Sequence, residues 1–152
     1  MVDNVKKLIR KYIAEGRMLN IATVDGDQPW SCIVYYASDK NLNFYWISKP
    51  DTRHSKEIQK HAKVAGSIPI KFDDLTVVGV QLEGDAVLVE SSEEIATKVK
   101  LYSDKFNRGE EWYTNFIAGK NEHKLYRITP RQFAIFDRVH FPDNSRQEWR
   151  PV

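Results

Sequence analysis

Apolar residues near the start of the chain recur every three or four positions, which is the spacing of one helical face. The pattern predicts an amphipathic helix that begins with Asp3 as its N-cap and ends at Gly16. Such a helix needs an apolar surface to cover. Its predicted buried residues are Val5, Leu8, Ile9, Tyr12 and Ile13.

The pattern then changes to that of strands, with alternating or β-branched apolar positions separated by turn residues. Residues 18–24 and 30–37 flank a turn at 25–29, so the sequence predicts a β-hairpin. A third strand is expected to start at Leu42 and to lead into a basic loop at 46–56. The three strands together predict an antiparallel meander.

The middle of the chain continues with strands and one short helix. We expect a helix over residues 53–61, a strand over 64–70 and a long strand over 75–90. The long strand contains Gly79 and Gly84. Glycines inside a strand often mark bulges, so we expect the sheet to bend at both positions.

The last third of the chain combines helical and extended patterns. Ser91 and Glu94 have the spacing of a capping box and predict a helix that ends at 107–109. A further helical turn is expected at 112–117. Strands are then expected at 124–129 and 132–137, separated by Pro130. Residues 139–152 are expected to form an extended tail.

This order of elements lacks the regular strand–helix alternation of a parallel sheet. It predicts a mainly β fold, a closed or partly closed antiparallel barrel with peripheral helices. The 152 residues suffice for one compact core, and neither a linker nor an internal repeat divides them. We therefore expect a single domain over 1–152.

Composition narrows the class of partner. Hydrophobic residues make up 41% of the chain and the net charge is only +2, which argues against disorder and against a nucleic-acid partner. A small barrel that stacks single-stranded bases on its aromatic strand residues is the alternative. The aromatic residues concerned are Tyr35, Tyr36, Tyr45 and Trp46.

Cys32 is the only cysteine, so no internal disulfide can form, and this fits a reducing compartment. The sequence contains neither a signal-peptide pattern nor about 18 consecutive apolar residues. We therefore expect a soluble, cytoplasmic protein without a membrane partner.

Common catalytic and metal-binding motifs are missing from the sequence. The four histidines form no HExxH pair, and one cysteine is too few for a zinc or iron–sulfur site, so no metal is expected. GxSxG, P-loop and GxGxxG motifs are absent as well. If the protein is an enzyme, a cofactor is expected to supply the chemistry, and the sequence assigns no catalytic acid or base.

The basic loop at residues 46–56 carries the strongest functional signal. It places hydroxyls and cations after an aromatic strand and at the start of a predicted helix, where backbone N–H groups and a guanidinium can converge on a phosphate. The loop therefore suggests a phosphorylated cofactor. The alternative is a basic turn that is only solvated.

The strand order together with this loop resembles the pyridoxamine 5′-phosphate oxidase-like family of split β-barrels that bind flavin mononucleotide (FMN). The segments that carry the resemblance are 52–54, the helix through Ile58, 63–66 and 80–86. A closer resemblance is to an uncharacterised bacterial branch of that family. It rests on the combination of 30–32, 43–45, 52–54 and 64–66.

The resemblance implies a six-stranded antiparallel split barrel of Greek-key type, and a homodimer with the cofactor at the subunit interface. It implies that Thr52 and Arg53 bind the flavin phosphate with help from Ser48, and that Lys56 adds a further cation. The resemblance also places His54 in the phosphate-binding loop, directly after the arginine. The residues that it places beside the flavin ring are Ser31, Cys32, Ile33, Val34, Trp46, Ile47 and Gln81.

The chain also departs from the family pattern. His54 stands where the family has a lysine, and Ser31 and Tyr36 stand where the oxidase has basic residues. The tail at 141–147 lacks the Arg–His–Arg signature that holds pyridoxal phosphate, so vitamin B6 oxidation is not expected.

The resemblance thus implies an FMN-dependent oxidoreductase that passes hydride or electrons to an unidentified acceptor, with an unknown small-molecule substrate. The alternative is a non-catalytic module with the same fold that holds flavin, haem or a deazaflavin, or no cofactor.

Overall fold

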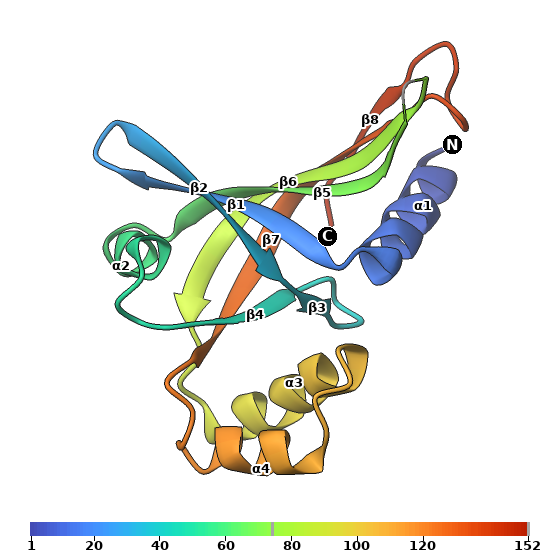
Figure 1. Ribbon diagram of the computed structural model, residues 1–152. Helices are drawn as coiled ribbons and strands as arrows, with labels where there is room; N and C mark the ends of the chain where they lie inside the picture. The colour runs from blue at the N-terminus through green and yellow to red at the C-terminus, as the bar shows by residue number, and fades with distance from the viewer. Residues whose placement is uncertain (74, 152) are drawn as a thin grey trace.

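The computed structural model describes residues 1–73 and 75–151, in which an eight-stranded antiparallel sheet carries helices around it (Figure 1). The helices are α1 (Val2–Glu15), α2 (Arg53–Lys60), α3 (Ser92–Lys105) and α4 (Glu110–Ile117). The strands are β1 (Met18–Asp25), β2 (Gln28–Tyr35), β3 (Ala37–Ser38), β4 (Phe44–Ser48), β5 (Lys63–Phe72), β6 (Val77–Leu88), β7 (Lys124–Asp137) and β8 (Arg146–Trp149).

The strand order is β2-β1-β5-β6-β7-β4-β3, with β8 paired to β7. Among the described residues no ladder joins β2 to β3 or β4, so the sheet has two free ends and is not hydrogen-bonded into a closed cylinder. The expected dominance of antiparallel strands is confirmed. The expected number of six strands is wrong, because the short strands β3 and β8 add to the sheet.

The predicted β1–β2 hairpin is confirmed, and its turn contains Gly26 with a φ of 62°. The predicted meander is wrong. The chain leaves the sheet at Tyr36, whose buried hydroxyl donates to the carbonyl of Ile13 at 2.6 Å. The β4 strand then pairs with β3 and β7 instead of β2. A local alternation of side chains cannot reveal this choice of partner.

Both glycines of β6 lie at irregularities of the sheet, as predicted. The β5–β6 register shifts between Pro69 and Lys71, opposite Gly79, and the β6–β7 register shifts beside Gly84. The second shift also explains why Pro130 does not divide β7 into two strands as expected. The proline lies at a bulge, where the ladder does not need its missing N–H group.

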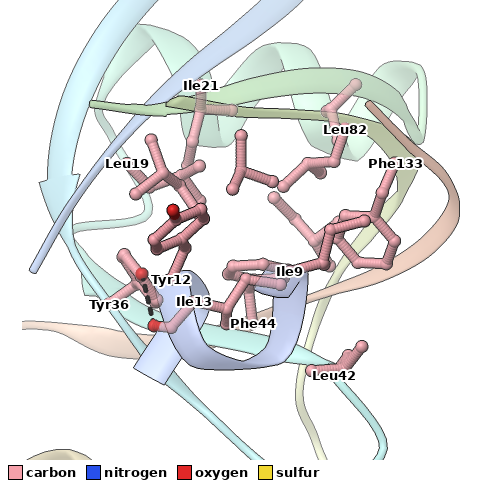
Figure 2. Packing of buried hydrophobic residues seen from close by; sticks show 14 of the residues in the cluster. Ile9, Tyr12, Ile13, Leu19, Ile21, Tyr36, Leu42, Phe44, Leu82 and Phe133 are labelled. Atoms are coloured by element: carbon pink, nitrogen blue, oxygen red, sulfur yellow. Dashed lines mark hydrogen bonds between the residues drawn. The ribbon is translucent and has the colours of Figure 1, made fainter. Parts of the chain in front are cut away.

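Helix α1 covers the main core, as its apolar face predicted. The five expected residues of that face are buried, and Figure 2 shows Ile9, Tyr12 and Ile13 packed against strand residues that include Phe44 and Phe133. Gly16 ends the helix as expected. Asp3 is not the N-cap, because the helix begins two residues earlier, with Met1 in the capping position and Asp3 in the first turn.

Helices α3 and α4 lie below β4 (Figure 1). They pack with β4 and β7 around a second apolar cluster. Ser91 caps α3 by accepting a hydrogen bond from the amide of Glu94 at 3.3 Å, as predicted. The Glu94 side chain does not return the capping bond. It accepts from Tyr45 and Arg127 instead, which ties α3 to strands β4 and β7.

The C-terminal segment is not the extended tail that the sequence predicted. Strand β8 pairs with β7, and the Trp149 ring stacks on Phe133 with centroids 5.7 Å apart. This contact provides the apolar surface that Trp149 needs. Before β8, the fully buried Asp137 accepts hydrogen bonds from the Tyr12 hydroxyl at 2.6 Å and from Nδ1 of His140 at 2.7 Å.

Within residues 1–73 and 75–151, no helix combines the length and the apolarity that a membrane crossing requires.

Candidate functional site

The basic loop leads into α2, as predicted, and Thr52 is the N-cap of that helix. Its hydroxyl accepts from the Ser55 amide at 3.3 Å, and its extended backbone matches the usual N-cap conformation. The Thr52 hydroxyl also bonds the Ser55 hydroxyl at 2.7 Å. The first turn of α2 lies beside the end of β4, because Nε2 of His54 is 2.8 Å from the hydroxyl of Ser48. The free amides and the positive end of the helix dipole are therefore at this end of β4.

A groove of about 400 Å³ lies at the open seam between β2 and β4, and we call it the seam groove. Six of the predicted binding residues line it: Ile33, Val34, Ile47, Ser48, Thr52 and His54. The other lining residues are Tyr35, Lys49, Tyr102, Arg108 and His123. No carboxylate is among these residues. The lining therefore combines an apolar wall with hydroxyls and cationic or neutral nitrogen groups, which suits an anionic ligand.

His54 connects the hydroxyls at the basic end of the seam groove. Its Nε2 atom lies 2.8 Å from the Ser48 hydroxyl and 3.3 Å from the Thr52 hydroxyl. Burial lowers the pKa of His54, although the charge of Glu57 opposes this effect. The imidazole is therefore neutral at pH 7 and takes part by hydrogen bonding, whereas a lysine at this position would add a full charge.

Arg53 does not line the seam groove but lies beside the start of it. Its guanidinium covers the Trp30 ring at 4.1 Å from the centroid, and its Nε donates to Glu57 at 2.9 Å. Glu57 in turn accepts from the Thr23 hydroxyl at 2.7 Å. These contacts hold the Arg53 side chain in one place and engage only its Nε, so the terminal nitrogens can still bind an anion.

Lys49 adds a cation at the rim of the groove, where its Nζ pairs with Glu122 at 2.7 Å. Lys56 lies one turn further along α2 and is exposed outside the groove. Of the cations in the basic loop, Lys49 therefore lines the candidate site and Lys56 does not.

Three groove residues come from the region of α3 to β7 that sequence reasoning left without a role. They are Tyr102, Arg108 and His123. Arg108 follows Asn107, whose positive φ of 51° ends α3. The His123 ring bonds the side-chain oxygen of Asn121 at 2.9 Å. A helix end that carries Asn-Arg-Gly was visible in the sequence, but nothing local indicated that it lies against β2.

The remaining predicted residues lie outside the groove lining. The Trp46 side chain is fully buried in the core and stacks on Tyr126, so only its backbone could serve a ligand. Ser31 is exposed on β2, and Gln81 is exposed on β6, next to Leu82 and Phe133 in another hollow. The structure therefore brings Gln81 to a different face of the same chain.

Cys32 is half-buried on β2, where burial and, to a smaller extent, the charge of Glu57 raise the pKa of its thiol to about 11. The thiol is therefore protonated at neutral pH and is a poor nucleophile. Within the described part of the chain, no group of three His, Cys, Asp or Glu side chains is placed to hold a metal ion.

Sequence comparison finds relatives among bacterial UPF0306 proteins. One from Photorhabdus laumondii is 24% identical over 97 residues, which cover 62% of this chain and 67% of the relative. Another from Pasteurella multocida is 22% identical over 147 residues, which cover 95% of this chain and 91% of the relative.

Solved structures share the fold at low identity. A conserved hypothetical protein from Mycobacterium tuberculosis, Rv2991, superposes with a TM-score of 0.77 at 18% identity, covering 90% of this chain and 87% of that one. A haem-binding protein from Mycobacterium smegmatis gives 0.72 at 15% identity, over 93% and 56% of the two chains. An FAD-binding protein from Mesorhizobium loti gives 0.66 at 16% identity, over 82% and 88%.

The family model described as pyridoxamine 5′-phosphate oxidase matches residues 5–136, which include every strand from β1 to β6 and nearly all of β7. That span contains the seam groove and the whole of α2. The chain therefore belongs to the pyridoxamine 5′-phosphate oxidase family.

Proposed function

We propose that the seam groove binds FMN and that the protein is an FMN-dependent oxidoreductase with an unidentified small-molecule substrate. The observation that carries the proposal is the convergence of two hydroxyls and the start of α2 at one end of a groove whose wall is apolar. Groove volume is compatible with this use, because ligand sites commonly enclose about 300–1,000 Å³.

The basic end of the groove matches the needs of a phosphate. Ser48 and Thr52 supply hydroxyls, and the amides of Arg53 and His54 belong to the first turn of α2, which has no carbonyl partner inside the helix. Arg53 and Lys49 supply positive charge, and each is already paired with a glutamate. A phosphate would therefore share these cations with Glu57 and Glu122.

The apolar part of the groove matches the needs of a flavin ring. Ile33, Val34 and Ile47 form one wall, and β2 is an edge strand whose outer backbone groups have no ladder partner among the described residues. Such groups can bond the polar edge of the ring and hold it in one orientation.

When bound, FMN supplies the hydride and electron transfer. The chain's own residues bind the phosphate, orient the ring along β2 and exclude water with the apolar wall. Because its pKa is lowered, His54 adds no full positive charge near pH 7. A lysine at that position would therefore strengthen phosphate binding.

The proposal includes a homodimer in which a second copy completes each site. Large apolar side chains are exposed in two separate places, on β2 at Ile33 (66%) and Tyr35 (49%) and on the β5–β6 hairpin at Phe72 (74%) and Val77 (52%). In a two-fold dimer each patch can face the other patch of the partner. Gln81 lies beside the second patch and would then reach the partner's groove.

A non-catalytic module that holds haem or a deazaflavin is the second candidate. Two histidines, His54 and His123, line the groove, and imidazole is a common axial ligand of haem iron. The solved relatives include one protein named for haem binding and one named for FAD binding. Absorption spectra separate these cases, because bound haem shows a Soret band and bound flavin is yellow.

Replacing Arg53 with alanine should weaken FMN binding about 10-fold or more, because a charge-assisted hydrogen bond contributes about 1.5–3 kcal/mol. Quenching of flavin fluorescence gives the affinities of FMN and of riboflavin, which lacks the phosphate. We expect the variant to lose affinity for FMN and to keep its affinity for riboflavin.

Arg131→Ala is the matched control, because Arg131 is also a half-exposed arginine paired with a carboxylate, and it does not line the groove. Equal FMN affinity of Arg53→Ala and the unchanged protein would reject the phosphate assignment. Oxidation of nicotinamide nucleotides in the presence of FMN then tests turnover, and binding without any turnover would favour the module.

Sedimentation velocity should show a species of two 17.7 kDa chains at micromolar concentration. Phe72→Glu is expected to shift this species to the monomer, because it places a charge in the exposed apolar patch of the β5–β6 hairpin. Val139→Glu serves as control, since Val139 is similarly exposed (59%) but lies outside both patches. A monomeric unchanged protein would show that Gln81 does not serve a second subunit.

A further inference from the structure

A second hollow adjoins α2 and shares no lining residue with the seam groove, and we call it the α2 hollow. It has a volume of about 540 Å³ and is enclosed by α2, the end of β6 and the start of β7. Figure 1 shows the end of β6 between α2 and β7. Its polar and apolar lining residues include Ser55, Ile58, Lys60, Ala86, Glu90 and Tyr126.

The floor of the α2 hollow is apolar and firmly held. Ile58 and Ala86 are almost completely buried, and the Ala86 amide donates to the carbonyl of Ala62 at 2.8 Å. This bond joins the short link between α2 and β5 to β6. Val87 and Leu88 form an apolar rim and expose 37% and 42% of their surface. The hollow can therefore cover an apolar body of moderate size.

Tyr126 gives the hollow a polar group that no protein atom uses. Its side chain is only 3% exposed and stacks on Trp46, with ring centroids 5.5 Å apart. Within residues 1–73 and 75–151, no hydrogen bond to its hydroxyl is formed. In this part of the chain, two side-chain polar atoms are fully enclosed and have no hydrogen-bond partner, Nε1 of Trp46 and Nε of Arg127. The Tyr126 hydroxyl is not among them, so it is not fully enclosed. It therefore borders the accessible space of the hollow. A ligand that fills the hollow removes water from this hydroxyl and must replace the lost hydrogen bond with one of its own.

Two opposite charges are among the lining residues of the α2 hollow. Lys60 is the last residue of α2, and Glu90 follows β6. Both side chains are exposed, and in the described part of the chain neither forms an ion pair. The lining thus has one positive and one negative charge, and its net charge is zero.

We propose that the α2 hollow binds a free α-amino acid whose apolar side chain has a polar tip, as in tyrosine. The ligand's carboxylate meets Lys60, its ammonium group meets Glu90, its ring covers the apolar floor and its terminal hydroxyl pairs with the Tyr126 hydroxyl. A zwitterion fits the neutral pair of charges better than a simple acid or amine does. The site is separate from the seam groove, so the proposal does not depend on flavin binding.

Titration calorimetry with L-tyrosine, L-phenylalanine, tyramine and 3-(4-hydroxyphenyl)propionate tests each part of this match. The unchanged protein should bind tyrosine more tightly than the other three, because each of them lacks one polar group. Tyr126→Phe keeps the ring that stacks on Trp46 and removes only the hydroxyl. It should weaken tyrosine binding about 2- to 12-fold and leave phenylalanine unchanged, as the loss of one hydrogen bond predicts.

Two surface variants test the charges without touching the core. Lys60→Ala should weaken tyrosine and the propionate but not tyramine, and Glu90→Ala should weaken tyrosine and tyramine but not the propionate. Tyr113→Phe is the control, because the Tyr113 hydroxyl already bonds the carbonyl of Ala96 away from the hollow. The proposal is overturned if tyrosine does not bind at millimolar concentration, if phenylalanine binds equally well, or if Tyr126→Phe binds tyrosine unchanged.

Discussion

Replacing Asp137 with alanine is expected to lower the free energy of unfolding by about 3 kcal/mol or more. The Asp137 carboxylate is fully buried and accepts from the Tyr12 hydroxyl, from the His140 ring and from the amides of Val139 and His140. Its removal leaves the buried Tyr12 hydroxyl and three partly buried N–H donors of Val139 and His140 without this acceptor, and the loss at the buried hydroxyl is the most costly. Urea unfolding measured by circular dichroism gives the difference.

The same carboxylate should make stability depend on acid. Burial alone would raise the pKa of Asp137, but hydrogen bonds from the Tyr12 hydroxyl and from the amide and ring of His140 lower it below its ordinary value. The stabilisation is therefore complete above the ordinary aspartate pKa of about 4 and is lost as the pH falls through the lower pKa of the folded state. Unfolding curves between pH 7 and about pH 2 should show this loss.

Asp137→Asn should remove that part of the acid dependence, since the amide does not titrate in this range. Asp104→Ala is the control, because Asp104 is exposed and pairs with Lys100 on the surface of α3. It should change stability little. If the Asp104 variant loses as much free energy of unfolding as the Asp137 variant, the buried network contributes no more to stability than an exposed ion pair.

The sequence predicts local elements well where their signals are local. The apolar face of α1, the helix that follows the basic loop, the capping residue Ser91 and the β1–β2 turn all depend on neighbours within a few positions, and all are confirmed. The partner of β4 and the strand β8 are different. Their pairing depends on residues of β7 that lie far away in sequence, so alternation alone cannot identify it.

The candidate site shows the same limit. The residues around Thr52 could be found because a helix start after a strand has a recognisable pattern. Arg108 and His123 could not, because they meet the groove only through the packing of α3 and α4 against β4. Arg53 and Glu57 are four residues apart on a helix, so their ion pair follows from local spacing. The stacking of Arg53 on Trp30 requires the β1–β2 hairpin to fold over α2, which no local pattern indicates.

Gly84→Ala is expected to destabilise the fold by about 3 kcal/mol, the upper part of the range for overpacking. A Cβ atom at Gly84 would overlap the carbonyl oxygen of Thr129 and lie 2.9 Å from the Cα atom of Pro130. Both obstacles are backbone atoms of the neighbouring strand at the β6–β7 bulge. They can move only if the ladder itself opens, so no change of rotamer relieves the contact.

Gly79→Ala provides a matched control on the same strand, since the sequence marks both glycines in the same way. A Cβ atom at Gly79 meets only the carbonyl oxygen of Ile68, at 3.2 Å, and a small shift accommodates it. Thermal unfolding should therefore show a large decrease in melting temperature for the Gly84 variant and a small one for the Gly79 variant. Equal decreases would mean that glycine is needed for strand flexibility in general, whereas the expected difference assigns the effect to the contact with β7. Because β7 also pairs with β4, which carries Ile47 and Ser48 to the seam groove, the Gly84 variant should also weaken the FMN binding that we propose for that groove.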